Sequence, residues 1–403
     1  MQYNKKNTLK LSVLASLVSI SVAGTAQASL YDALAGGKAF ADFRLRYESV
    51  DQENPVEDAD ALTLRTRLGY TTGNYNGFSA VVELEDNRIV GGQGDFTVGP
   101  TGFNPGLFSV IADPEHTELD QGFVQYKNES VTVKVGRQVI ALDGQRFVGH
   151  VGWRQDRQTF DALRVIYSPV EGLTLDYSYV DQRNRIFGEE ADFDSKDHLF
   201  NASYKLGSGK LVGYAYLLEI DNDTDNSLDT YGISYTGGID LSGTKLSYKA
   251  EFATQSSETA TTDFDADYLG LEVGATFSGV TAKVGYESLG SDDGAFGFST
   301  PLATLHKFNG FADIFLRTPN QGLVDTYVGL SGNVGGGKLT ATYHMYDADE
   351  SMVGADDFGD EINLLYVRKF AKHYTLGVKY AAFSAEDIAV DTDKLMVWVQ
   401  TKF

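Results

Sequence analysis

Apolar and polar residues alternate along most of the chain with a period of two. In residues 41–48, for example, Phe43 and Leu45 alternate with Arg44 and Arg46. This period predicts β-strands with one apolar and one polar face. We expect about sixteen to eighteen such strands, and favour eighteen. Further alternating segments lie at residues 62–68, 78–85, 173–179, 212–218, 231–235, 246–252, 269–277, 280–286, 339–345 and 374–380.

Two features favour a transmembrane β-barrel over a soluble β-sandwich, which would also alternate. The apolar faces often begin or end with tyrosine or phenylalanine, as the aromatic girdles of membrane barrels do. The connections also alternate in length: short ones at residues 72–77, 207–209 and 335–337 contrast with long acidic ones at 52–60 and 221–229. The sequence therefore predicts an all-β fold, a single-chain antiparallel barrel with its apolar face in lipid.

The last ten residues form another alternating strand that ends on Phe403. This segment resembles the C-terminal strand by which bacterial outer-membrane barrels are recognised for assembly. We therefore expect the barrel assembly machinery to be a partner of this chain. Outer-membrane lipids and lipopolysaccharide are the other partners that a barrel in this membrane implies.

The first 28 residues have the features of a secretory signal peptide. Three lysines precede an apolar stretch too short to span a membrane, and Ala26-Gln27-Ala28 is a small-x-small cleavage site. Removal of 28 of the 403 residues leaves 375, with a net charge of −26 because the signal carries three lysines and no acid. We expect residues 1–28 to be the signal and residues 29–403 to form one barrel domain in the bacterial outer membrane.

The length of the remaining chain allows a wide barrel. Eighteen strands leave about twenty-one residues for each strand and its connection, and a spanning strand needs roughly nine to eleven. The sheet has to close, because an open edge in lipid leaves backbone groups unpaired. A barrel of 16–18 strands encloses an aqueous channel. The chain has no cysteine, so disulfides contribute nothing to its stability.

Alternation places a group of arginines and acids on the polar, lumen-facing side of the first strands. Arginine rings at a constriction select anions. The alternative is that acids and arginines pair inside the barrel and hold its wall rigid. The expected channel-lining residues of these strands are Arg44, Arg46, Arg65, Arg67, Glu83 and Glu85, with Asp42 nearby.

A second concentration of arginine lies between residues 134 and 167, in a chain that is acidic overall. This stretch has the pattern of a strand, a long loop and a strand. We expect the loop, residues 141–157, to fold inward and bring Trp153 into the pore with its arginines; an external loop is the alternative. The expected channel-lining residues here are Arg137, Arg146, Arg154, Arg157, Asp161 and Arg164.

The alternation of lipid-facing and lumen-facing residues in this stretch is irregular at one position. Strict alternation places Arg137 on the same face as Val131, Val133 and Val135, which would face lipid. Arginine at the bilayer midplane costs about 2–4 kcal/mol. We therefore expect either a β-bulge at Gly136 that resets the phase or a position of Arg137 beyond the apolar band.

Three runs resemble the alginate export family of outer-membrane channels: VGRQVIALDGQRFVGHVGWRQDRQTFDALRV (Val135–Val165), FSTPLATLHKFNGFADIFLRTPNQGLVDTYVGLSG (Phe298–Gly332) and YHMYDAD (Tyr343–Asp349). The likeness covers essentially the whole chain after the signal. It implies an eighteen-stranded monomeric barrel with an arginine-rich constriction. Such a channel passes anionic uronate polymers, alginate among them, or smaller anionic and polar solutes or oligosaccharides.

The run TPLATLHKFNG (Thr300–Gly310) has few features of a lipid-facing strand. Pro301, Asn309 and Gly310 interrupt the alternation. We expect a long loop that plugs or narrows the mouth of the barrel. A packed Ω-type surface loop is the alternative.

Other chemistries have little support in the sequence. The six histidines lack the spacing of metal ligands, and we expect them to be solvated or to line the lumen. Residues 221–232 begin like a calcium loop but have Asn226 and Gly232 at the positions of the required Gly and Glu. We expect an acidic external loop there, able to bridge to lipopolysaccharide through divalent ions. No cofactor is expected, and the net charge disfavours nucleic acid.

We consider three functions: an anion-selective channel, a general diffusion porin and an outer-membrane barrel enzyme. No motif places a nucleophile beside His150 or His344, so the enzyme has the least support. An anion-selective channel predicts reversal potentials in planar bilayers that favour anions, and a smaller preference in Arg65→Ala and Arg67→Ala. A cation-selective or non-selective current would contradict it.

Overall fold

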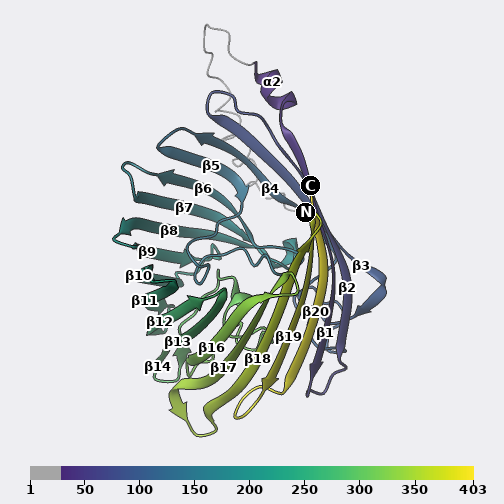
Figure 1. The fold of residues 1–403 in the computed structure, drawn as a ribbon, viewed down its shortest axis with the longest axis vertical. Coiled ribbons are helices and arrows are strands. Elements are labelled where there is room, and N and C mark those ends of the chain that lie inside the picture. The colour runs from purple at the N-terminus through teal and green to yellow at the C-terminus, as the bar shows by residue number, and fades with distance from the viewer. Residues whose placement is uncertain (1–28) are drawn as a thin grey trace.

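Hydrogen bonds join each strand to the next along the chain, and the last strand to the first, in the computed structural model, which describes residues 29–403. β20 (Thr392–Lys402) pairs antiparallel with β1 (Lys38–Gln52), with Leu45 opposite Val399. The result is a closed antiparallel sheet of 18 strands, as expected (Figure 1). The proposed signal peptide, residues 1–28, lies outside the described residues.

The remaining strands of the barrel follow in chain order. They are β2 (Ala59–Thr71), β3 (Phe78–Asp95), β4 (His116–Lys127), β5 (Val131–Gln138), β6 (Thr159–Tyr167), β7 (Leu173–Asn184), β8 (Phe193–Leu206), β9 (Gly209–Glu219), β10 (Ser227–Leu241), β11 (Thr244–Glu258), β12 (Asp263–Phe277), β13 (Val280–Leu289), β16 (Leu323–Val334), β17 (Gly337–Met352), β18 (Ala355–Phe370) and β19 (Tyr374–Ser384).

The two ends of the barrel differ in their connections. Every connection at the end that holds Ser29 and Phe403 has six residues or fewer, and residues 207–208, 242–243, 278–279 and 335–336 are two-residue turns. The opposite end carries the long segments 96–115, 139–158 and 290–322. Short turns at one end and long loops at the other are typical of outer-membrane barrels, in which the short turns face the periplasm.

Short helical elements occupy the connections. α2 (Leu30–Ala35) begins at a capping box in which the side chains of Ser29 and Asp32 each accept a hydrogen bond from the other's backbone N–H. The 3₁₀ turns are η1 (Glu189–Ala191) and η2 (Leu305–Lys307). No helix within residues 29–403 is long and apolar enough to cross a membrane.

Side chains on β1 and β2 follow the predicted alternation. Leu45 and Leu68 are exposed on the outer face, where lipid lies, whereas the four arginines of these strands are buried inside the barrel. Arg44 and Arg65 are cross-strand partners, so their guanidinium groups project into the lumen side by side.

The expected orientation of residues 212–218, with the apolar side chains facing lipid, is wrong. The apolar face of β9, formed by Val212, Tyr214, Tyr216 and Leu218, is buried inside the barrel instead of facing lipid. The reason is that Phe147, from a loop folded into the lumen, packs against Tyr214 and Tyr216. This part of the inner wall is therefore apolar because it supports a protein segment.

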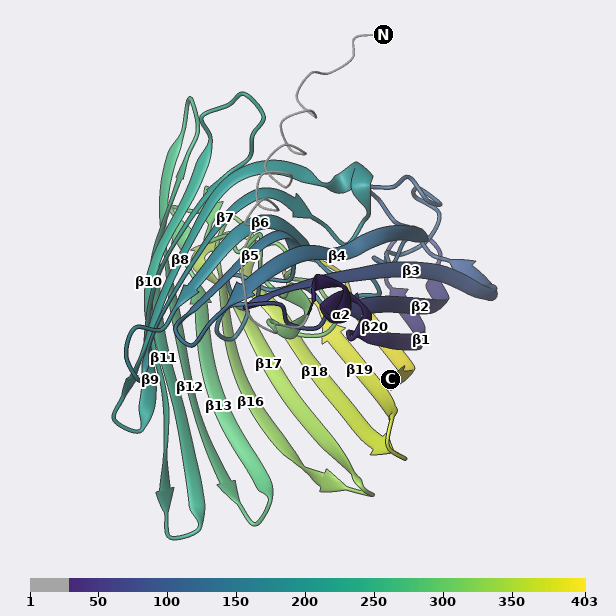
Figure 2. The same cartoon turned by 90° about the horizontal axis from the view of Figure 1, so that it is seen from above.

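The long connections fill much of the lumen. Figure 2 shows the ring of strands from above, with connecting segments lying inside it. The segments 139–158 and 290–322 contribute fully buried apolar side chains, among them Ile140, Phe298 and Leu302. A third segment, residues 96–115, packs Phe96 and Ile111 near the long-loop end of β1 and β2.

Neighbouring positions of β13 lie on opposite faces of the sheet. We expect the outer position to be destabilised by a charged side chain and the inner position to tolerate one. Val284→Arg places a cation on the exposed outer face, beside Val273 and Val328. We expect a loss of up to about 2–4 kcal/mol in free energy of unfolding, the larger values applying near the bilayer midplane. Reversible guanidinium unfolding in liposomes measures it.

Lys283→Arg is the matched control, because Lys283 lies on the inner face and bonds Glu272. We expect it to leave the free energy of unfolding within about 0.5 kcal/mol of the parent. Equal losses in the two variants would contradict the assignment of faces.

Candidate functional site

Two connecting segments enter the barrel and bind each other there. Segment 139–158 joins β5 to β6, and segment 290–322 joins β13 to β16 and includes the small hairpin β14 (Ser291–Asp292) and β15 (Phe296–Gly297). The backbone N–H of Gly149 donates to the carbonyl of Leu302 at 2.8 Å, and that of Thr304 donates to the carbonyl of Gln145 at 3.1 Å. Both loops were expected to enter or narrow the barrel, and both expectations are confirmed.

Aromatic side chains anchor these segments to the wall. Phe147 contacts Tyr268 and Phe298 with ring centroids 5.2 Å and 5.9 Å away. Trp153 stacks on His306 at 4.8 Å and meets the edge of Trp398 at 5.0 Å. Burial of several aromatic rings contributes about 2–3 kcal/mol each, so the segments are held as parts of the core.

The four arginines of β1 and β2 lie on the lumen side, as predicted, but segment 139–158 covers them. Among residues 29–403, the hydrogen-bond partners of Arg44 are uncharged groups: it donates to Gln155 Oε1 at 2.8 Å and to the carbonyls of Gly152 and Arg154. Arg46 donates to the carbonyl of Trp153 at 2.7 Å. These bonds fasten the loop backbone to the wall.

Carboxylates neutralise three of these four arginines. Arg46 forms ion pairs with Asp113 and, at 3.2 Å, with Glu48. Arg65 lies 2.8 Å from Asp42. Arg67 forms an ion pair with Glu85.

The loop arginines are paired in the same way. Arg154 lies 3.0 Å from Glu48 and 2.7 Å from Asp313, so it links β1 to both inward segments. Arg157 lies 2.7 Å from Glu83 and 2.5 Å from Asp120. Each of these pairs is largely buried, and removal of one partner of such a pair leaves an uncompensated charge.

Arg146 is the loop arginine that reaches the open part of the lumen. It lies 2.8 Å from Glu287 and donates to Asn309 Oδ1 at 3.2 Å. Arg164 of β6 lies on the inner face and pairs with Asp176 of β7 at 2.6 Å. For these lumen arginines the geometry matches the alternative in which acids and arginines form ion pairs inside the barrel.

Arg137 lies at the long-loop rim, one residue before the end of β5, and pairs with Asp161 at 2.8 Å. Of the two alternatives expected here, a bulge at Gly136 is absent, because the register is continuous from Gly122 opposite Arg137 to Val124 opposite Val135. The position of Arg137 at the strand end fits the other alternative. Gly136 instead has a φ of 118°, and a Cβ there would meet the carbonyl oxygen of Gly122. The glycine allows this close approach, and the strand end places the arginine at the rim.

The open part of the lumen is a cavity of about 560 Å³ between the inward segments and the wall formed by β9–β13, β16 and β17. Its basic residues are Arg146, Lys210, Lys249, Lys283 and Lys307, and its acids are Asp143, Glu251, Glu272, Glu287 and Asp325. Sequence reasoning missed the lysines. Lys249 and Lys283 occupy polar positions of alternating segments, which was the available signal.

Most of the accessible charges in this cavity are cations. The side chains of Lys210, Lys249 and Lys283 are 50%, 31% and 37% exposed, whereas those of their paired acids Asp143, Glu251 and Glu272 are 25%, 5% and 34% exposed. Lys307 is also exposed, and it donates to the carbonyl of Gly144 at 2.7 Å. Partial burial and the positive charges of Lys249 and Lys283 lower the pKa of Lys307, because three ammonium groups share the space.

The acids of the cavity are engaged by neighbouring tyrosines as well as by cations. Tyr214 donates to Glu251 at 3.1 Å, Tyr268 to Glu287 at 2.7 Å and Tyr327 to Glu272 at 2.8 Å. These tyrosines occupy carboxylate oxygens that a cation would otherwise meet. The formal charges of the lining are balanced, but the exposed ones are mainly positive.

The family model described as alginate export matches residues 39–286. The matched region includes the run at 135–165 and ends before the runs at 298–332 and 343–349, which the resemblance also covered. A search of the curated proteins gives no significant match.

Several solved structures share the fold. Acinetobacter baumannii OccAB4 is 13% identical with a TM-score of 0.74, over 91% of this chain and 98% of that one. A BenF-like porin from Pseudomonas fluorescens Pf-5 is 15% identical with a TM-score of 0.72, over 92% and 100%. Pseudomonas aeruginosa OpdL is 16% identical with a TM-score of 0.71, over 92% and 99%. At these identities the likeness establishes the fold. Because the family model spans more than half of the chain and the barrel is of the porin type, this bacterial outer-membrane channel protein belongs to the alginate export family.

Proposed function

We propose that the barrel is a passive channel for small anionic or polar solutes, with uronates as the class that the family favours, and that it has no enzymatic activity. The observation that carries this proposal is the set of exposed ammonium groups around the lumen cavity. Rings of basic side chains in a pore select anions. The solute contacts are assigned to the lysines, and Arg44, Arg46 and Arg154 hold the inward segments.

The size of the cavity supports small solutes over a wide polymer passage. About 560 Å³ falls within the range of sites that hold small molecules. The lysine ammonium groups suit the carboxylate of such a solute, whereas the Arg146 guanidinium is engaged by Glu287, Thr300 and Asn309. The tyrosine hydroxyls and amide groups around it suit the hydroxyls of a sugar.

A general diffusion porin is the competing function. It would pass solutes according to size and would not depend on the lysines. The balanced formal charge of the lining, five basic and five acidic residues, is the feature that favours it.

The selectivity test replaces three of the four lysines that line the cavity. The combined variant Lys249→Gln, Lys283→Gln and Lys307→Gln is expected to lower the ratio of chloride to potassium permeability several-fold, since Lys210 is then the one exposed lysine left in the lining. Reversal potentials in planar bilayers under a KCl gradient measure the ratio. Liposome swelling should show a matching loss for glucuronate relative to glucose.

Lys196→Gln is the matched control. Lys196 is also half-exposed, but it pairs with Glu219 and Asp221 near the long-loop end. We expect it to leave the permeability ratio unchanged. An unaltered ratio in the triple variant, or equal passage of glucuronate and glucose in the parent protein, would favour the diffusion porin.

Arg154 anchors segment 139–158 to Glu48 and Asp313, and Arg154→Gln tests this anchoring. The variant leaves Glu48 and Asp313 with fewer cationic partners, at a cost of up to about 3–5 kcal/mol. Part of that cost is offset because Arg46 and Lys394 remain beside these acids. We expect segment 139–158 to detach from the wall, which should raise single-channel conductance and current noise.

Arg88→Gln is the control, since Arg88 forms an exposed pair with Asp86. Such pairs contribute about 0–1 kcal/mol, so conductance should not change. Identical single-channel traces from the two variants would show that Arg154 does not hold the segment.

A further inference from the structure

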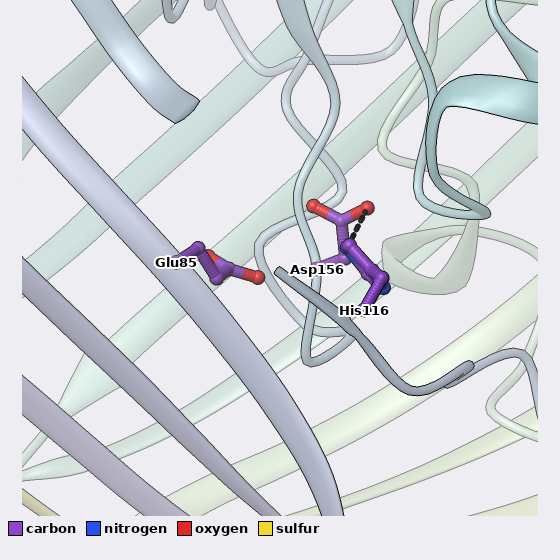
Figure 3. Close-up of side chains that lie close together, drawn as sticks. All are labelled: Glu85, His116 and Asp156. Atoms are coloured by element: carbon purple, nitrogen blue, oxygen red, sulfur yellow. Dashed lines mark ion pairs between the residues drawn. The ribbon is translucent and has the colours of Figure 1, made fainter. Parts of the chain in front are cut away.

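Three potential metal ligands from separate segments meet inside the barrel wall. They are Glu85 of β3, His116 at the start of β4 and Asp156 of segment 139–158; Figure 3 shows His116 and Asp156 in contact, with Glu85 to one side of them. One donor atom from each lies within 4.8 Å of the others. Within residues 29–403 this is the one group of three or more such side chains close enough to hold a metal ion.

The donor atoms of this group lack hydrogen bonds. Both carboxylate oxygens of Asp156, Oε1 of Glu85 and Nε2 of His116 are buried without a hydrogen-bond partner within the described part of the chain. Asp156 and Glu85 are both fully buried. A buried polar atom without a partner costs about 1–3 kcal/mol, and more when charged. Several such atoms at one point indicate a missing ligand.

The Nε2 atom of His116 points at Asp156. Its Nδ1 donates to the carbonyl oxygen of Pro114 at 3.2 Å, the kind of contact that fixes the tautomer and orientation of a metal-bound histidine. Its Nε2 lies 3.1 Å from Asp156 Oδ2, so a proton on Nε2 forms an ion pair with Asp156, and a metal ion would displace this proton.

The local charge also favours a cation. Arg67 neutralises one oxygen of Glu85 and leaves Oε1 free. Among the described residues, Asp156 forms an ion pair with His116 but with no arginine or lysine. Glu118 of β4 adds a further carboxyl group near Asp156 and His116, and its Oε1 is also buried without a hydrogen-bond partner within the described residues.

The donor set suits a first-row transition ion. One imidazole nitrogen with carboxylate oxygens matches zinc, whereas magnesium and calcium prefer all-oxygen sites. Donors of a tetrahedral zinc site lie about 3.3 Å apart. The 3.1 Å contact already fits, and Glu85 needs a side-chain shift of about 1–2 Å to complete the group.

An external cavity adjoins the site at His116. A cavity of about 540 Å³ lies between the segments 96–115 and 185–192, and His116 forms part of its wall. The exposed acids Glu115, Glu189 and Glu190 also line it. An acidic vestibule raises the local concentration of cations.

We propose that Glu85, His116 and Asp156 bind a divalent transition ion of the zinc class, which clamps segment 139–158 to strands β3 and β4. This role is independent of which solute the channel passes. The three ligands are 31 and 40 residues apart in sequence, so a bound ion would join segments that the chain itself does not connect closely.

The test uses untagged protein refolded in detergent without lipopolysaccharide, because histidine tags and lipopolysaccharide bind divalent ions themselves. After dialysis against EDTA and then buffer, calorimetric titration with ZnCl₂ is expected to show one ion per chain. His116→Gln and Asp156→Asn should each weaken binding at least tenfold. Heat-modifiable gel mobility identifies the folded barrel in each sample.

His344→Gln is the matched control, since His344 is also buried and lies 2.9 Å from Asp325 but belongs to no group of three ligands. It should bind zinc as the parent does. Absence of binding in the parent, or equal binding in all variants, would overturn the proposal.

A measurement on the parent protein keeps the test valid if the variants do not fold. X-ray absorption of the zinc-loaded barrel should show a first shell of nitrogen and oxygen with one imidazole. Zinc should also raise the thermal unfolding temperature of the parent. A shell of oxygen without imidazole would place the ion elsewhere and overturn the assignment.

Discussion

Closure of the backbone hydrogen-bond network is the constraint on which the whole structure depends. In hydrocarbon, every N–H and C=O has to bond within the protein, and a sheet achieves this only when its last strand meets its first. The pairing of β20 with β1 therefore determines that the molecule has an inside. Eighteen strands make that inside too wide for wall side chains alone to fill, so its contents have to come from connecting segments.

The contents of the lumen follow from this width. Two connections fold back into the barrel and bring apolar anchors such as Phe147 and Phe298, which require apolar partners on the wall. The face of β9 supplies them, at the expense of the usual polar lumen surface. Charged side chains that the loops cover are then buried, and a buried charge needs a partner. Arg46, Arg67 and Arg154 meet this requirement with carboxylates, and the accessible cations are left to the far wall, where Lys249 and Lys283 lie.

Because segment 139–158 covers the arginines, arginine and lysine have different roles in this barrel. Arginine holds the inward segments because its fork bonds carbonyls and carboxylates together, as Arg44 and Arg154 do. Lysine remains exposed on a flexible stem along the cavity. The position of segment 139–158 connects both roles, since it lies over the arginines, borders the cavity with Arg146 and carries Asp156 to the ligand cluster.

The sequence by itself determined the barrel, its strand number, the two unequal ends and the inward direction of Arg44, Arg46, Arg65 and Arg67, because alternation and connection length are local properties of the chain. It also indicated that segments 141–157 and 300–310 are loops that enter the barrel. Only the tertiary structure decided which charges are covered and which are accessible. It reversed the phase expected for β9, placed Arg137 at the rim without a bulge, and brought Glu85, His116 and Asp156 together from distant positions. The physical reason is that alternation specifies the face of a side chain, whereas burial and pairing depend on what another segment lays over that face.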